Sequence, residues 1–298
     1  MSQTTVVRTD TGESLEQLAR RHSLASAGAL PTLRQYAVEI WAYRHFITSY
    51  ANARVSSNLG TTHLGSIWQV LTPLFNAAVY YVIFGVILNT KAGTGNFIAY
   101  LCCGVFIYQF TSSVLTAGTQ GITSNLGLIR ALNFPRAALP ISIVLIEVRN
   151  LVASMGVLIA IVLLTGEPIT HQWLYAIPAL FLQTVFNTGL AMFFARLGSK
   201  VLDIKNLIPF LMRIWLYMSA VLYPVQRFSD KLHGWKLHLL EANPLLVYIE
   251  LIRHSLLEHI KLAGSPTLLW IEGAIWAAVV FMIGFVYFWR GEKGYGRG

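Results

Sequence analysis

The sequence predicts an all-α membrane protein with six transmembrane helices. Hydrophobic residues make up 55% of the 298 residues and charged residues only 12%, about half the charged share of a typical soluble protein. The apolar residues occur in long blocks, and the basic residues cluster in the loops between them. An excess of Lys and Arg in cytoplasmic loops is typical of membrane proteins, so the net charge of +9 does not indicate nucleic acid as a partner.

Six segments are apolar over a length that crosses, or nearly crosses, a hydrocarbon core about 30 Å thick as a helix. They are Ile67–Leu88, Phe97–Ala117, Leu139–Leu164, Trp173–Phe194, Leu207–Tyr223 and Leu268–Trp289. The fifth is the shortest. With the N-terminus inside, the cytoplasmic loops hold many Arg and Lys residues and the short outer loops hold only Lys91, so both termini are expected in the cytoplasm.

Residues 1–32 are polar and lack the apolar core of a signal peptide, which predicts a cytoplasmic tail before a membrane domain of residues 33–298. In residues 33–57, apolar side chains recur at steps of three and four, which predicts an amphipathic helix at the membrane interface. These side chains are Leu33, Tyr36, Ile40, Tyr43, Ile47 and Tyr50. The alternative is a helix that packs on a soluble domain, but no such domain is in sight.

Residues 118–138 form a loop that is too polar to span a membrane and too apolar to be a free linker. We therefore expect another protein to dock there.

Residues 224–267 lie on the predicted outer side. Asn243 is a suitable N-cap and Pro244 suits the first helical position. The run that follows has about 14 residues with ionisable side chains among them, which is too short and too charged to cross a bilayer alone. We expect a re-entrant or interfacial helix pair in this segment.

The sequence contains no GxxxxGK[ST] phosphate-binding loop, so this chain cannot bind ATP through a loop of that kind. HExxH, CxxC and GxSxG motifs are also missing from it, as is the acidic pair of a metal-dependent transferase. We therefore expect no catalytic residue, metal site or cofactor in this chain. Cys102 and Cys103 are adjacent in an apolar run and are predicted to be buried free thiols.

Several segments together resemble the permease subunit of polysaccharide-export ABC transporters. Before and within the first span the sequence has Asn58-Leu59-Gly60, Leu64-Gly65-Ser66-Ile67-Trp68 and Leu71-Thr72-Pro73-Leu74, although His45 stands where the family has an acidic residue. The loop Leu128–Pro140 is similar to the family's coupling segment. Asp203-Ile204, Pro209 and Tyr223-Pro224 resemble its fifth span, without the family's proline near Ser219-Ala220, and Asn243-Pro244 with Arg253 resembles its outer gate.

The resemblance covers roughly residues 36–290 and implies a homodimer of this chain with two P-loop ATPase subunits in the bacterial cytoplasmic membrane. A polyprenyl-diphosphate-linked polysaccharide would pass through a conduit between the two permeases. Family substrates include O-antigen, teichoic acid and mycobacterial galactan, and the Ala-rich, acid-poor composition with a long polar N-terminus favours a cell-wall galactan. ATP turnover would extrude the glycan stepwise.

The resemblance also implies roles for individual residues. Coupling to the ATPase is assigned to Leu128, Ile129, Arg130, Phe134, Pro135 and Arg136. The translocation path is assigned to Arg213, as a contact for a diphosphate headgroup, and to the aromatic residues Trp68, Tyr80, Tyr81, Phe84, Phe106, Tyr108, Phe110, Trp215, Tyr217 and Tyr223. Aromatic faces contact sugar rings, and tyrosine hydroxyls bond to sugar hydroxyls. Packing and interface anchoring are the alternative explanation for the aromatic residues. The outer gate is assigned to Asn243, Pro244 and Arg253.

Charged side chains inside the spans need partners, since one near a span centre costs about 2.5–3.5 kcal/mol. Glu147 and Arg149 lie in the third predicted span and Arg213 in the fifth. An ion pair between Glu147 and Arg213 is one hypothesis, and contact with water or a diphosphate is another.

Three other functions remain open from the sequence. A drug or small-lipid efflux permease would share the coupling loop. A membrane-embedded glycosyl or lipid transferase would need an acidic pair, and an ion channel would work without an ATPase partner.

Overall fold

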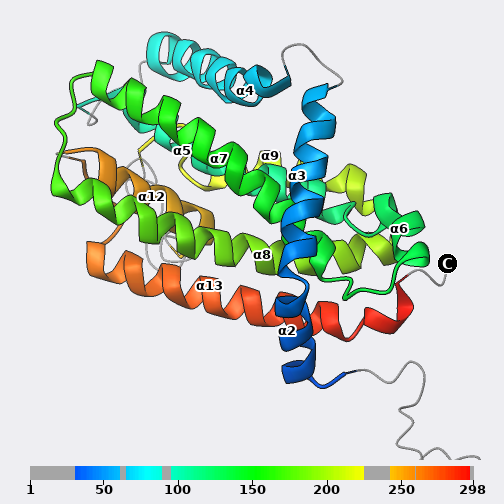
Figure 1. Cartoon of the computed structure of the whole chain (residues 1–298). Coiled ribbons are helices and arrows are strands. Elements are labelled where there is room, and N and C mark those ends of the chain that lie inside the picture. Colours follow the sequence, from blue (N-terminus) through cyan, green and yellow to red (C-terminus); the bar gives the residue numbers. More distant parts are fainter. Residues whose placement is uncertain (1–30, 61–64, 89–94, 225–241, 259, 296–298) are drawn as a thin grey trace, which may run out of the picture.

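The computed structural model describes residues 31–60, 65–88, 95–224, 242–258 and 260–295, and all regular secondary structure in these ranges is helical. Its core consists of α5 (Phe97–Thr119), α7 (Ala138–Leu164), α8 (Ala176–Lys200) and α13 (Pro266–Trp289), which lie side by side in Figure 1. Each is long and apolar enough to cross a membrane, α8 together with the short helix η3 (His171–Tyr175) that precedes it. The predicted second, third, fourth and sixth spans are thus confirmed as helices of spanning length.

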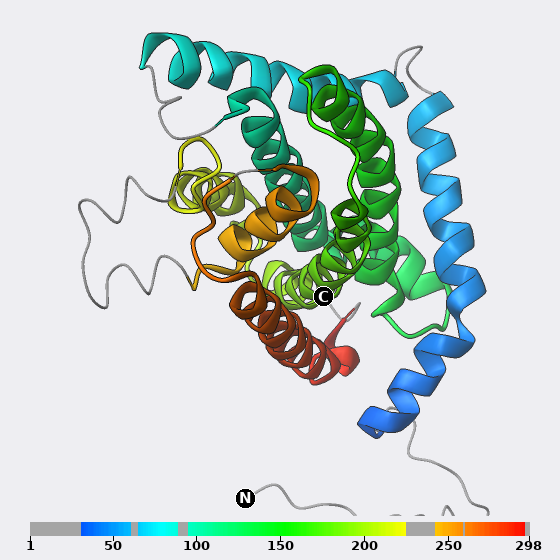
Figure 2. The ribbon, with the colours of Figure 1, turned by 90° about the vertical axis from the view of Figure 1, so that its left-hand side faces the viewer.

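The first predicted span corresponds to α4 (Gly65–Tyr80), which continues as the π-helix η1 (Tyr81–Ile87). Figure 2 shows α4 lying across one side of the core, where it packs against α5 and α7. Pro73 lies inside α4 and is buried. Its apolar part, Leu71–Ile87, is shorter than the four helices of spanning length, so this span remains a prediction.

The fifth predicted span is wrong at its C-terminal end. Helix α9 covers only Ile204–Met218, 15 residues, which rise about 22 Å and do not cross a core of about 30 Å. The helix stops because Ala220 adopts a left-handed backbone with φ 46°, a conformation that often ends helices. Residues 219–222 and Pro224 then turn inside the protein, where all of them are buried.

The predicted interface helix forms two helices, α2 (Leu33–Ala42) and α3 (Arg44–Gly60), which meet at Tyr43. A capping box between Thr32 and Gln35 starts α2. The two helices run crosswise over one end of the core (Figure 1), and we call it the α6 end because α6 (Leu126–Ala131) lies there. Their apolar stripe packs on protein, since Tyr36 and Ile47 are buried against the ends of the core helices, and the position of these helices at the membrane interface stays a prediction. The ends of the bundle supply the apolar surface that a soluble domain would otherwise provide.

Helices α8 and α13 touch backbone to backbone. A Cβ atom on Gly284 would lie 2.0 Å from the carbonyl oxygen of Gly189, and one on Gly189 would lie 2.4 Å from that of Val280. Similar close contacts join α8 to α5, where a Cβ on Gly198 would lie 2.1 Å from the Thr119 carbonyl oxygen. Small residues at such crossings let membrane helices pack by van der Waals contact.

We predict that Gly284→Ala destabilises the protein, because its methyl group meets a backbone atom that cannot move aside. Overpacking of this kind costs about 1–3 kcal/mol, although alanine otherwise favours a helix over glycine by about 1 kcal/mol. The measurement is the unfolding temperature in detergent. Gly156→Ala in α7 is the matched control, since no atom of the other described segments lies within 4 Å of its Cβ position. Equal unfolding temperatures for the two variants would contradict the close contact.

Candidate functional site

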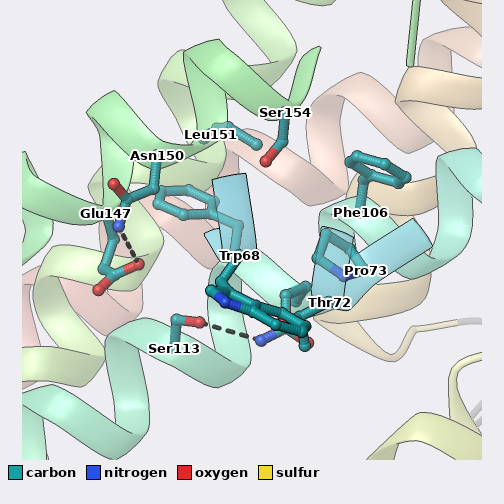
Figure 3. Close-up of a pocket in the computed structure, with 11 residues that line it drawn as sticks. Trp68, Thr72, Pro73, Phe106, Ser113, Glu147, Asn150, Leu151 and Ser154 are labelled. Atoms are coloured by element: carbon teal, nitrogen blue, oxygen red, sulfur yellow. Dashed lines mark hydrogen bonds between the residues drawn. The ribbon is translucent and has the colours of Figure 1, made fainter. Parts of the chain in front are cut away.

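A cavity of about 320 Å³ lies between α4, α5 and α7. Aromatic side chains line it at Trp68, Phe106 and Phe110, and polar side chains line it at Gln109, Ser113, Glu147, Asn150 and Ser154. Figure 3 shows this cavity from close by. Asn150 Nδ2 donates to Glu147 Oε2 at 3.1 Å, and Gln109 Nε2 donates to Ser113 Oγ at 3.1 Å. The cavity therefore combines flat apolar faces with neutral hydrogen-bonding groups and one carboxyl group.

A second cavity of about 270 Å³ shares Glu147 with the first and continues toward the α6 end. Its lining residues are Tyr50, Arg54, Ala117, Gln120, Gly121, Ser124, Asn125, Ile143, Ile146 and Glu147. Along α5 and along α7, the residues that line both cavities follow steps of three and four, so each set occupies one helix face. We call the two cavities together the α5–α7 groove.

Three of the predicted path residues line this groove, namely Trp68, Phe106 and Phe110. Others gather near α9: the Tyr108 hydroxyl donates to the Met212 carbonyl oxygen at 2.9 Å, and the rings of Phe84 and Tyr223 lie 6.5 Å apart. Tyr81 instead lies beside Phe97. On α9 itself, Tyr217 and Arg213 are exposed and Trp215 and nearby Tyr80 are half-buried.

Sequence reasoning missed the polar residues of the groove, Gln109, Ser113, Asn150 and Ser154. Their signal was present as polar side chains at steps of three and four inside apolar spans. The hypothesis that Glu147 pairs with Arg213 is wrong, because no ion pair joins these two described residues. Glu147 bonds to Asn150, and Arg149 bonds to Asn52 on α3.

We predict that a cysteine at Ser113 reacts with a small water-soluble thiol reagent. Ser113 lines the cavity, whereas the native Cys102 and Cys103 are buried and free, as predicted, and should give a low background. Ser142→Cys is the matched control, because Ser142 is fully buried and bonds to the carbonyl oxygens of Ile47 and Ala138. The measurement is the labelling rate in membranes, and equal rates at the two positions would argue against an accessible groove.

Two of the predicted outer-gate residues, Asn243 and Arg253, form hydrogen bonds to the end of α9 and to the buried turn that follows it. Asn243 caps α12 (Pro244–Leu256) as expected and Pro244 opens that helix. The Asn243 side chain also accepts from Trp215 Nε1 at 2.8 Å and donates to the Met218 carbonyl oxygen at 3.2 Å. One asparagine therefore ties the start of α12 to the end of α9.

Arg253 of α12 is fully buried and supplies the donors that the turn after α9 needs. Its guanidinium donates to the carbonyl oxygens of Ala220 at 3.1 Å, Val221 at 3.0 Å and Tyr100 at 3.2 Å. Glu250 balances its charge at 2.9 Å, and the guanidinium lies over the Tyr100 ring at 3.4 Å. A buried charge is tolerated only when it is paired and hydrogen-bonded in this way. We call these groups the Arg253 cluster.

Helix α12 has 13 residues and rises about 20 Å, too little to cross a membrane. At its start, the Ala242 carbonyl oxygen accepts from Trp276 Nε1 at 2.9 Å. Trp276 lies ten positions into α13, about 15 Å along that helix. At its end, the Glu258 backbone N–H donates to Glu167, just beyond α7, at 3.0 Å. Helix α12 therefore starts deep in the bundle and ends at the face opposite the α6 end. Residues 225–241, where the partner helix was expected, lie outside the described residues.

We predict that Arg253→Met destabilises the protein by about 3–5 kcal/mol, because Glu250 is left as a buried unpaired charge. The double variant Glu250→Gln, Arg253→Met should recover part of this loss, since only the carbonyl groups then lack partners. Unfolding in detergent is the measurement, and Arg213→Met, at an exposed position, is the control. If the Arg253→Met variant is as stable as the Arg213→Met variant, the stabilising role of the Arg253 cluster is refuted.

The predicted coupling loop contains η2 (Thr123–Asn125) and α6. Ile129 and Phe134 are buried within this chain at 5% and 4% exposure, and Pro135 is also buried. Phe134 packs on Phe46 of α3, with ring centroids 4.8 Å apart. The surface here is formed by Arg130, Leu132 and Asn133, with Leu128 and Arg136 partly exposed. Ile129 and Phe134 thus anchor the loop in this conformation, and Leu132, 50% exposed, was missed by sequence reasoning.

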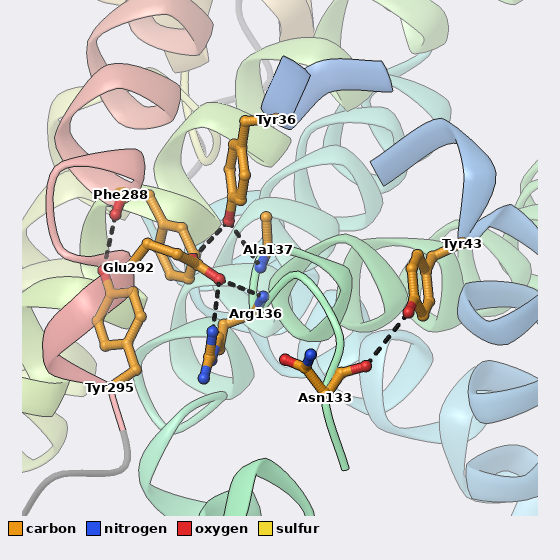
Figure 4. A network of polar contacts seen from close by, with 8 residues as sticks. All are labelled: Tyr36, Tyr43, Asn133, Arg136, Ala137, Phe288, Glu292 and Tyr295. Atoms are coloured by element: carbon orange, nitrogen blue, oxygen red, sulfur yellow. Dashed lines mark hydrogen bonds and ion pairs between the residues drawn. The ribbon is translucent and has the colours of Figure 1, made fainter. Parts of the chain in front are cut away.

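The loop is joined to both ends of the described chain through Glu292, in η4 (Glu292–Gly294) after α13 (Figure 4). The Tyr36 hydroxyl donates to Glu292 Oε2 at 2.6 Å, and the Arg136 backbone N–H donates to Oε1 at 2.8 Å. Burial raises the pKa of the Glu292 carboxyl above its usual value, although the hydrogen bonds from Tyr36 and Arg136 oppose this shift. Burial and the nearby Glu292 also raise the pKa of Tyr36, so its hydroxyl keeps its proton.

Comparison with known proteins places these features in a family. The family model described as ABC-2 type transporter matches residues 49–257. The O-antigen export system permease protein RfbA of Myxococcus xanthus is 23% identical over 245 residues, which cover 80% of this chain and 92% of that protein. The protein of the same name from Klebsiella pneumoniae is 26% identical over 212 residues, 71% of this chain and 80% of that protein. With its four apolar helices of spanning length, the chain is a multi-pass membrane protein that belongs to the ABC-2 type transporter family.

Proposed function

We propose that this chain is the permease subunit of an ATP-driven exporter that moves polyprenyl-diphosphate-linked polysaccharide across the bacterial cytoplasmic membrane. The observation that carries the proposal is the nearly full-length similarity to O-antigen export permeases. Membership of a transport family favours a conduit over an enzyme. A galactan substrate is a further hypothesis, based only on composition.

The α5–α7 groove supports a sugar substrate. Trp68 offers a ring that is 52% exposed, and Gln109, Ser113 and Asn150 offer hydrogen bonds without a fixed positive charge. Aromatic faces and neutral polar groups suit sugar rings, which are apolar on their faces and polar on their edges. Such contacts are weak and repeated, which permits stepwise movement of a polymer.

We place a second copy of the chain against α9 and α4. On α9 the residues Phe210, Arg213, Ile214 and Tyr217 are exposed and recur at steps of three and four, so they form one face. A face that contains Arg213 is costly against lipid, and a conduit between two copies would remove that cost. The Arg253 cluster and the start of α12, deep in the bundle, fit a re-entrant gate beside this conduit.

We place an ATPase subunit at the α6 end, which would then be cytoplasmic together with both termini. Arg130, Leu132 and Asn133 are exposed there, and this mixture of basic, apolar and amide side chains fits a groove on another protein. ATP and Mg would bind the ATPase subunit, since the present chain has no phosphate-binding loop.

A drug or small-lipid efflux permease is the second candidate. The larger cavity, about 320 Å³, falls at the lower end of the range for small-molecule sites, and this size favours a compact amphipathic ligand over a polymer.

The proposal predicts that mild detergent co-purifies a P-loop ATPase with this chain, and that depletion of the chain makes lipid-linked glycan accumulate on the cytoplasmic side. The readouts are mass spectrometry of the purified complex and extraction of lipid-linked glycan. Without an ATPase in the complex, the exporter function fails. Unchanged glycan pools combined with altered drug tolerance would favour efflux.

A further inference from the structure

Glu292 joins three segments that are far apart in the sequence (Figure 4). It accepts hydrogen bonds from Tyr36, 256 positions away, and from the backbone and side chain of Arg136, 156 positions away. Its exposure is 6% and that of Tyr36 is 1%. A carboxylate in such a place needs a reason, because burial without partners is costly.

The hydrogen bonds around Glu292 suit a carboxylate. The Tyr36 hydroxyl accepts from the Ala137 backbone N–H at 3.2 Å and donates its single proton to Glu292 Oε2 at 2.6 Å. The Arg136 backbone N–H and guanidinium also only donate. In the hydrogen bonds described, Tyr36 and Arg136 both donate to Glu292, and a glutamine in its place would replace one acceptor oxygen with an N–H₂ donor.

Further contacts fix the same loop to the same helices. The Tyr43 hydroxyl donates to the Asn133 carbonyl oxygen at 3.2 Å, and Phe134 packs on Phe46. Trp289, at the end of α13, donates through Nε1 to the Pro31 carbonyl oxygen at 2.8 Å. Residues 133–137 are thus held by the interface helices on one side and by Glu292 on the other.

This arrangement makes a rigid connection out of a short loop. The exposed Arg130 and Leu132 lie only a few positions before the held segment. A displacement of α6 therefore cannot be absorbed by the loop alone, because residues 133–137 bond both to α2 and α3 and to the end of α13. Loops usually absorb such movements, and here the hydrogen bonds remove that freedom.

We propose that Glu292 is a positioning residue that locks the coupling loop to α2 and α13, so that movement of the partner ATPase is transmitted to the membrane helices. This inference rests on the proposed exporter function. It assigns to the C-terminal segment a role in energy coupling rather than in substrate contact or ATPase docking.

The test uses the full chain in complex with its co-purified ATPase. In Glu292→Gln and in Tyr36→Phe, the complex should assemble and release inorganic phosphate from ATP at a rate close to that of the wild type. Cells that carry either variant should export about tenfold less glycan per ATP hydrolysed, since the loss of one hydrogen bond to a charged group changes an equilibrium by about that factor. The combined variant should be no worse than Glu292→Gln alone, because both changes break one network.

The matched control is Glu39→Gln, which makes the same chemical change at an exposed position on α2 and should export normally. Normal export by both Tyr36→Phe and Glu292→Gln would overturn the lock. A parallel fall of ATP hydrolysis and export, or loss of the ATPase from the complex, would make the network a docking element and would also overturn it. If Glu292→Gln does not fold, Tyr36→Phe decides. If the wild-type chain binds no ATPase, the exporter function itself is refuted. This result is distinct from failure of the Glu292 lock, in which the wild-type complex still forms.

Discussion

The backbone contact between Gly189 and Gly284 sets the register of α13, and the rest of the structure depends on that register. Eight positions after Gly284, Glu292 bonds to Tyr36 of α2 and to Arg136 in the loop before α7. Eight positions before it, Trp276 bonds to the residue that precedes Asn243. Trp276 lies about 12 Å along the helix from Gly284, and Glu292 follows shortly after the helix ends at Trp289. One contact between two glycines therefore positions both the Glu292 network at the α6 end and the Trp276 hydrogen bond near the start of α12. Helix α8, which carries Gly189, also packs on α5, α7 and α12.

Polar groups are distributed in two distinct ways in this protein. In the Arg253 cluster and around Glu292, donors and acceptors match each other and little polar surface is left for a ligand. In the α5–α7 groove the polar atoms line open space, and Glu147 has a hydrogen bond only from Asn150 among the contacts described. Saturated networks give rigidity, whereas polar groups facing a cavity are available to a substrate. The groove is for this reason the better candidate for substrate contact, and the saturated clusters are the better candidates for structural control.

Much of the fold could be predicted from the sequence because run length and hydropathy are local properties. The second, third, fourth and sixth predicted spans became helices of spanning length, although α8 continues to Lys200, six residues past its expected end. Asn243 and Pro244 started a helix because capping is also local. The end of α9 could not be predicted, since Ala220 adopts a left-handed backbone without being glycine. Long-range pairing was equally hidden: Arg253 bonds to groups on three segments, and Glu147 turned to its neighbour Asn150 instead of Arg213. An apolar side chain in a loop carries no sign of whether it packs on its own chain or on a partner, which is why Ile129 and Phe134 were expected on the surface.

The early end of α9 has a consequence for leakage. A helix that stops after about 22 Å leaves part of the hydrocarbon thickness without a continuous helical wall at that position. In a membrane, the buried turn after Met218 and α12 would fill the missing part, so a seal against water and ions would consist there of protein packing around the Arg253 guanidinium. Loosening of this seal would let protons and small ions pass while the remaining helices stay folded. The permeability of the resting protein would thus depend on the same few hydrogen bonds as its stability.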